Sequence, residues 1–213
     1  MPPEPLSTPN ESLARTLKAL KKNGFLAYFV PRAKEAEPLV LDFVQKGMRV
    51  GLGGSATLRE MGLVDRLKEK EALLLDHWDE SLTFEETLRV RKEQLTCDVF
   101  LSSVNAVTEQ GELVSRDGIG NRTSAMTFGP GKVFLLAGTQ KIVPDLSAAI
   151  RRIDEVAAPM RARSLNIDLP CTRAKGCVDC NAPHRLCRAT LILHRRPILT
   201  DITVILIGEP LGY

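Results

Sequence analysis

The stretch MRVGLGGSATLREMG, residues 48–62, runs from an apolar strand through a glycine-rich turn into a helix. This order is typical of parallel α/β sheets, which bind ligands at the carboxyl ends of their strands. Gly53 and Gly54 would let the backbone approach an anion, and Ser55 and Thr57 add hydroxyl groups. The four residues are therefore candidates for an anion-binding loop. The alternative is a tight strand-to-helix turn capped by Ser55 or Thr57.

The glycine turn does not match the common nucleotide-binding patterns. It is not a P-loop, because no lysine follows its last glycine. Ala56 occupies the third glycine position of the dinucleotide-binding pattern, which weakens that interpretation. The sequence therefore contains no convincing flavin or NAD site, and we do not expect a complete dehydrogenase in this chain alone.

Apolar runs and helix signals alternate along most of the chain. Strands are predicted at residues 25–30, 48–52, 72–76, 98–107, 113–114, 132–138, 189–194 and 202–209. Helices are predicted from an N-cap at Thr8 to Gly24, over 34–45, after Ser55, over 83–94 and over about 145–162. This alternation predicts a single α/β domain, residues 1–213, with a Rossmann-like, mainly parallel sheet and helices on both faces. Three loops, 51–57, 105–123 and 138–142, should meet at the strand ends.

Composition limits the classes of function. The 213 residues are 44% hydrophobic and 26% charged, with a net charge of +3. No apolar run approaches the roughly 20 residues of a membrane span, and the N-terminal sequence lacks a signal-peptide pattern. We therefore expect a cytoplasmic protein with reduced thiols and no membrane contact. Residues 151–196 are basic but contain no aromatic side chain, which argues against nucleic-acid binding. A basic surface for an anionic ligand or an acidic partner is the alternative.

Polar residues gather after the strand that ends near residue 107. They are candidates for binding a ligand: Asn105, Asp117, Gly118, Gly120, Asn121 and Arg122. A carboxylate beside Arg122 and Lys141 would bind and polarise a small hydroxy acid or keto acid. Glu109 and Lys141 are the catalytic candidates. For Asp117 the competing interpretation is a turn with Gly118, and for Glu109 it is a hairpin cap.

The stretch CTRAKGCVDCNAPHRLC, residues 171–187, contains four of the five cysteines. Cys171, Cys177, Cys180 and Cys187 are expected to bind one metal centre in an insertion at about residues 166–188. Zinc sites made only of cysteine usually contain two C-x2-C pairs, whereas this segment contains one. The looser spacing suits a [4Fe–4S] cluster, with zinc as the alternative, since His184 could replace one thiolate. Cys97 lies outside the segment and is expected to be a core residue.

Several stretches together resemble the LUD-domain family, the LutC/YkgG-like lactate-utilization proteins formerly called DUF162. The resemblance covers nearly the whole chain and rests on GGSATLREMG, NAVTEQGELVSRDGIGNR, AGTQKIV followed by AIRRIDEVAAPMRA, GCVDCNAPHRLCR and VILIGEPLGY. The cysteine-rich ending is similar to that of a subset of the family. The resemblance implies a fold similar to ribose-5-phosphate isomerase, glucosamine-6-phosphate deaminase and the CoA transferases.

The resemblance also implies a function. It suggests an accessory protein or subunit in the oxidation of lactate to pyruvate, beside iron–sulfur partner subunits, that binds a small organic acid or a phosphorylated ligand. One alternative is an iron–sulfur redox or assembly module without catalysis of its own. A second is an isomerase or a CoA-transferase-like enzyme, since those relatives place an acidic residue in loops comparable to those of Glu109 and Asp117. An oligomer is compatible with each of these.

Overall fold

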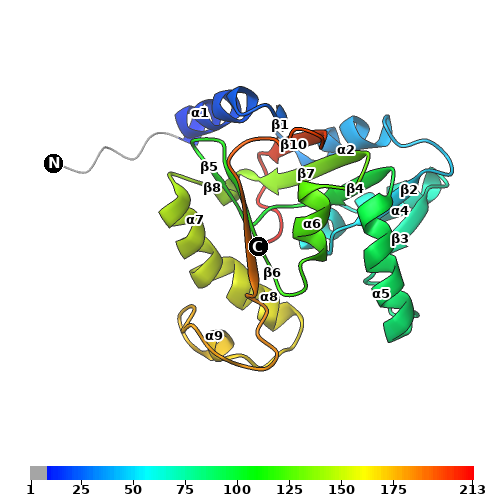
Figure 1. Ribbon diagram of the computed structural model, residues 1–213. Helices are drawn as coiled ribbons and strands as arrows, with labels where there is room; N and C mark the ends of the chain where they lie inside the picture. The colour runs from blue at the N-terminus through cyan, green and yellow to red at the C-terminus, as the bar shows by residue number, and fades with distance from the viewer. Residues whose placement is uncertain (1–8) are drawn as a thin grey trace.

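The computed structural model describes residues 9–213, and a six-stranded sheet lies at the centre of that part of the chain (Figure 1). All its neighbouring strands are parallel. In spatial order they are β1 (Leu26–Val30), β10 (Ile202–Ile207), β7 (Lys132–Gly138), β4 (Val99–Ser102), β2 (Arg49–Leu52) and β3 (Leu73–Asp76). The predicted α/β class and mainly parallel sheet are confirmed.

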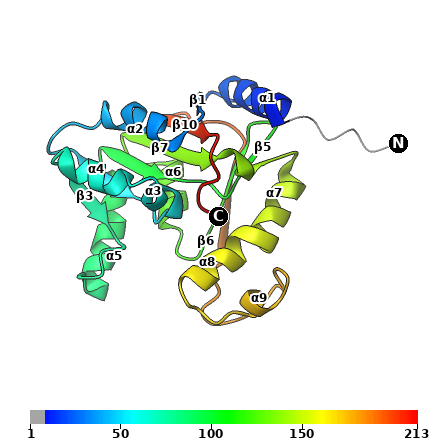
Figure 2. The same cartoon turned by 180° about the vertical axis from the view of Figure 1, so that it is seen from behind.

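The sheet has an apolar core on each face, because side chains alternate along its buried strands. In β7, Phe134 and Leu136 belong to one core, whereas Val133 and Leu135 belong to the other. The first core is completed by α2 (Ala33–Leu41), α3 (Ala56–Glu60) and α4 (Leu63–Glu69). The second is completed by α1 (Pro9–Lys22), α6 (Asn121–Thr127) and a second sheet. Helices cover both faces, as expected (Figures 1 and 2).

The second sheet has four strands within residues 9–213: β8 (Ile142–Val143), β5 (Ala106–Thr108), β6 (Leu113–Asp117) and β9 (Ala189–Leu193). The single strand predicted over residues 98–107 is therefore wrong. The chain leaves the main sheet after Ser102 and enters the second sheet at Ala106. Between them, the Asn105 side chain accepts a hydrogen bond from the Arg116 amide at 2.8 Å, which ties the break to β6.

Breaks separate consecutive helices at two places. Gly62, with φ of +67°, separates α3 from α4. The helix predicted over about 145–162 contains a π-helical turn, and Pro159 just after it has no amide hydrogen to continue the regular ladder. The pieces are α7 (Leu146–Arg152), η3 (Ile153–Ala157) and α8 (Ala158–Ser164).

The remaining helices are short or lie at the edges of the fold. They are α5 (Phe84–Glu93), α9 (Pro170–Arg173), η1 (Gln94–Thr96) and η2 (Thr139–Lys141). A capping box between Thr83 and Glu86 starts α5. Helix α1 begins at Pro9, and its expected N-cap, Thr8, lies outside the described residues. No helix of residues 9–213 combines the length and apolarity that crossing a bilayer requires.

The cysteine segment, residues 166–188, adds no strand to either sheet within the described chain. Leu169 and Cys171 pack with Ala162 of α8 in a small cluster of their own. Backbone hydrogen bonds anchor the segment: the Cys177 amide donates to the Asp154 oxygen at 2.8 Å, and the Arg188 amide to the Asp117 oxygen at 2.9 Å. The segment is thus fastened to η3 and to the end of β6 (Figure 2).

Candidate functional site

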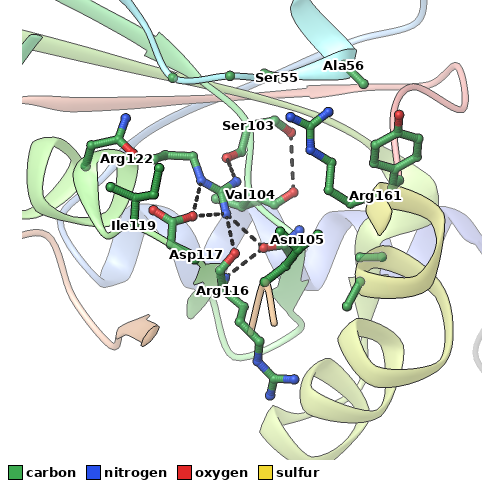
Figure 3. A pocket seen from close by; sticks show the side chains of 18 of the residues that line it. Ser55, Ala56, Ser103, Val104, Asn105, Arg116, Asp117, Ile119, Arg122 and Arg161 are labelled. Carbon is green, nitrogen blue, oxygen red and sulfur yellow. Dashed lines mark hydrogen bonds and ion pairs between the residues drawn. The ribbon is translucent and has the colours of Figure 1, made fainter. Parts of the chain in front are cut away.

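A cavity of about 360 Å³ lies where the three predicted loops meet. Its volume is in the range of small-molecule sites. Ten of the predicted ligand-binding and catalytic residues line it: Gly53, Gly54, Ser55, Thr57, Asn105, Asp117, Gly118, Asn121, Arg122 and Lys141. Helix α8 forms another wall (Figure 3). The structure therefore brings most of the predicted ligand-binding set together.

The glycine turn forms one wall of the cavity. A Cβ atom at Gly53 would lie 2.5 Å from the Ser102 hydroxyl oxygen, so this position excludes any side chain. Gly54 has φ of +62°, a conformation that favours glycine. Ser55 is the N-cap of α3 and accepts a hydrogen bond from the Leu58 amide at 3.4 Å. Thr57 instead faces Lys141.

Arg122 and Asp117 form a buried ion pair that holds the loops of the cavity in place. The Arg122 Nε donates to Asp117 Oδ1 at 2.8 Å, and Asp117 Oδ2 accepts from the Thr123 amide at 3.0 Å. Arg122 also donates to the Ser103 backbone oxygen and to the Asn105 side chain, both at 3.1 Å. The carboxylate thus neutralises the guanidinium within the wall, and both residues act mainly as structural ties (Figure 3).

Three other cations line the cavity without a carboxylate partner among residues 9–213: Arg91, Arg161 and Lys141. The Nε of Arg91 is buried and has no hydrogen-bond partner. The guanidinium of Arg161 lies over the Trp78 ring, 4.4 Å from its centroid. Figure 3 shows Arg161 and Arg122 on opposite sides of the pocket, with Ser103 and Val104 between them. The cavity is therefore strongly electropositive.

Lys141 is the most deeply buried of these cations, at 2% exposure. Its Nζ donates to the Thr57 hydroxyl at 3.1 Å and to the Ser103 hydroxyl at 2.9 Å. Burial lowers the pKa of Lys141 to about 7, helped by the positive charges of Arg152 and Arg122. An amine with this pKa is partly uncharged at neutral pH.

His77 belongs to the same cavity but was not among the predicted site residues. Burial lowers its pKa to about 4, so the ring is neutral at pH 7. The Gln94 side-chain amide contacts His77 Nδ1 at 2.9 Å, and Gln94 also donates to the Leu52 and Leu75 backbone oxygens. Both hydrogens of the Gln94 amide nitrogen are directed to these two backbone oxygens, so His77 contributes a neutral ring beside them.

Further polar and aromatic lining residues outside the predicted set are Trp78, Arg91, Ser103, Arg116, Arg161 and Tyr213. A signal existed for His77 and Trp78, because they follow the predicted strand 72–76 at its carboxyl end. No comparable signal exists for Arg91 or Arg161. They reach the cavity from the sides of α5 and α8, which the sequence alone does not orient.

Two predicted site residues lie elsewhere. Glu109 is not in the cavity wall; its carboxylate pairs with Arg15 of α1 at 2.9 Å, and this contact lowers its pKa. The expected convergence of Glu109 with Lys141 is therefore wrong, because β5 carries Glu109 away from the strand ends to α1. Gly120 is also outside the wall and is the N-cap of α6, with φ of +95°.

The four cysteines of residues 166–188 surround a second cavity, of about 20 Å³. Cys187 lines both this cavity and the larger one. The Asp179 amide donates to the Cys177 sulfur at 3.3 Å. Within residues 9–213, however, no three His, Cys, Asp or Glu side chains already stand in a metal-binding arrangement. The cysteines are neighbours, but their thiols do not form a closed site.

Comparisons with known proteins identify the fold. The family model described as LUD domain matches residues 13–207. The structure of a DUF162 family protein from Deinococcus radiodurans is similar, with a TM-score of 0.55 and 15% identity over 96% of this chain and all of the other. Ribose 5-phosphate isomerase from Plasmodium falciparum matches 53% of this chain and 52% of its own, with 16% identity and a TM-score of 0.35. No curated protein matches the chain.

Proposed function

Because this chain belongs to the LUD-domain family, we propose that it is a lactate-utilization-type protein whose strand-end pocket binds a small organic acid or a phosphorylated compound. In this role the chain would act as a subunit or accessory protein beside iron–sulfur partners in the oxidation of lactate to pyruvate. The pocket would hold the substrate or the product.

The observation that carries the proposal is the pair of permanently charged guanidinium groups without carboxylate partners, Arg91 and Arg161, beside the buried Lys141. Burying two positive charges in one cavity is costly unless an opposite charge compensates them. Asp117 does not compensate them, because Arg122 already pairs with it. An anionic ligand in the cavity would supply the missing negative charge, and His77 would add an uncharged ring.

Isothermal titration calorimetry tests the proposal with four ligands: L-lactate, pyruvate, inorganic phosphate and ribose 5-phosphate. At least one should bind, and Arg161→Gln should weaken binding by about tenfold or more, the effect of losing one charge-assisted hydrogen bond. Arg151→Gln is the matched control, because this substitution removes the same charge. Arg151 is exposed on α7 and does not line the cavity. Binding that is unchanged by Arg161→Gln would contradict the proposed site. Tight binding of ribose 5-phosphate alone would favour an isomerase-like function.

We also propose that Cys171, Cys177, Cys180 and Cys187 bind one metal centre. Thiolates suit both iron–sulfur clusters and zinc. The shared cavity, the amide-to-sulfur hydrogen bond at Cys177 and the separate apolar cluster around Leu169 support the proposal. The sequence spacing favours a [4Fe–4S] cluster. The cavity has roughly the size of one water molecule, which fits a single zinc ion without opening the loop.

Elemental analysis of protein purified and reconstituted without oxygen separates the two metals. A brown protein with near-stoichiometric iron would identify the cluster, and a colourless protein with one zinc would identify the alternative. Neither metal near stoichiometric amounts would refute the metal centre and leave the proposed ligand pocket untouched.

A further inference from the structure

Lys141 has neighbours that accept its hydrogen bonds but do not neutralise its charge. The Thr57 hydroxyl can donate its own proton to the Leu211 backbone oxygen at 3.3 Å, and the Ser103 hydroxyl to the Val104 oxygen at 3.3 Å. Both hydroxyl oxygens therefore present lone pairs to Nζ, at 3.1 and 2.9 Å. An uncharged amine would give its two hydrogens to these oxygens and keep its own lone pair unused.

The electrostatic surroundings favour this uncharged form. Burial is the main cause, and the nearby guanidinium groups of Arg152 and Arg122 act in the same direction. Glu60 is the acidic group that opposes them, and its carboxylate accepts a hydrogen bond from the Gly212 amide at 2.7 Å. No carboxylate of residues 9–213 forms an ion pair with Lys141.

Lysine differs from the other unpaired cations of the cavity in one chemical respect. Arg91 and Arg161 keep their charge at any ordinary pH, so they suit the permanent task of holding an anion. A lysine that only held an anion would gain nothing from surroundings that remove its proton. An uncharged lysine in an apolar, positively charged setting is instead a nucleophile toward carbonyl carbon.

We propose that Lys141 forms an imine with the carbonyl carbon of a 2-keto acid held in this pocket. The proposal rests on the proposed function, because the pocket must first bind the acid. The Nζ lone pair attacks the carbonyl carbon, and a C–N bond forms while the C=O π electrons move to oxygen. The two amine hydrogens end on that oxygen, which leaves as water, and the C=N bond remains. No oxidant or reductant takes part, and water reverses the step.

The remaining groups of the cavity suit the rest of such a ligand. Arg161 and Arg91 are available for its carboxylate, since neither has a carboxylate partner among residues 9–213. Thr57 and Ser103 contact Nζ and could pass protons during the loss of water. L-Lactate has no carbonyl carbon of this kind, so it can bind but cannot form the imine.

The test is chemical trapping with sodium borohydride, which reduces an imine to a stable secondary amine. Full-length protein is incubated with pyruvate and borohydride, and the intact mass and a peptide map are measured. We expect one pyruvate-derived adduct per chain, located on Lys141, and none with L-lactate. The yield should rise as the pH increases through about 7, where Lys141 loses its proton. Lys141→Arg should abolish the adduct, whereas Lys18→Arg, on the exposed side of α1, should retain it.

The peptide map of the wild-type protein decides the question even if Lys141→Arg fails to fold. Adducts spread over surface lysines, or a yield unchanged in folded Lys141→Arg, would overturn the inference. Calorimetric binding of pyruvate without an adduct would overturn the imine and leave the proposed function standing. Absence of binding by lactate, pyruvate, phosphate and ribose 5-phosphate would overturn both.

Discussion

The rim of the large cavity and the cysteine segment are both made of loops, but they are stabilised differently. The rim is fixed by a buried network in which Arg122 and Asp117 are 13% and 9% exposed. The cysteine segment has two ion pairs: Arg173 and Asp168 are 74% and 73% exposed, and Arg185 and Asp179 are 30% and 88% exposed. The rim also rests on the two cores of the main sheet, whereas the cysteine segment has only a small cluster around Leu169.

This difference indicates what each region needs in order to stay ordered. Ordering a loop costs roughly 1–2 kcal/mol per residue in backbone entropy. At the rim, buried hydrogen bonds and neighbouring cores offset that cost. In the cysteine segment few such contacts exist, so a bound metal would be a large part of its stabilisation. The rim should therefore be sensitive to single polar substitutions, and the segment to loss of its thiols.

The strongest test of this contrast exchanges one carboxylate in each region. Asp117→Asn removes the charge that neutralises Arg122 and leaves a buried guanidinium without a partner, which should cost about 3 kcal/mol of unfolding free energy. Asp168→Asn breaks an exposed pair and should change stability by less than about 0.5 kcal/mol. Urea unfolding of both variants gives the two values. Equal losses would show that the rim network is no more important than a surface pair.

The pH dependence of the unfolding free energy tests the lowered pKa of Lys141, which lies at the rim. Its pKa is about 7 in the folded protein, against 10.5 for an ordinary lysine, so the unfolded chain binds more protons between these values. Below about pH 7 the amine is charged in both states, and its burial lowers the unfolding free energy by the full amount. This destabilisation becomes smaller as the pH rises toward 10.5. Wild-type stability should therefore increase with pH relative to Lys141→Met, by at most about 1.4 kcal/mol per pH unit. A pH-independent difference between the two proteins would contradict the lowered pKa.

The smallest effect on stability is expected in the cysteine segment. Cys180→Ser should abolish metal binding and shift the thermal unfolding of the main sheet only slightly, because the segment adds no strand to it. Cys97→Ser should have the opposite effects, because Cys97 is 2% exposed and lies in the core. The metal content should not change, and the free energy of unfolding should fall by about 1 kcal/mol. The two variants are compared by elemental analysis and by calorimetric melting. Loss of the whole fold in Cys180→Ser would refute the separation of the two regions.

Local sequence patterns predicted the elements that depend on neighbouring residues. The apolar run at 132–138 became β7, and the Thr83–Glu86 spacing became a capping box. The position of the glycine turn was also predicted, because a turn between a strand and the following helix lies at the end of that strand. The turn lines the cavity there. The break at Ser103–Asn105 was missed, because apolar residues on both sides look continuous and only contacts with β6 and Arg122 bend the chain there.

The sequence by itself determined the class of fold and the approximate place of the pocket, because hydrophobic periodicity and turn chemistry are local properties. The family followed from the resemblance of whole stretches to LUD-domain proteins, which the family model confirms. Only the tertiary structure decided which charges remain free. In the folded chain Arg122 pairs with Asp117, and Glu109 pairs with Arg15 outside the cavity. The tertiary structure also brought Arg91 and Arg161 into the cavity from two separate helices and buried Lys141 between two hydroxyl groups. Charge compensation depends on distances between residues far apart in the chain, and those distances exist only once the two sheets have packed together.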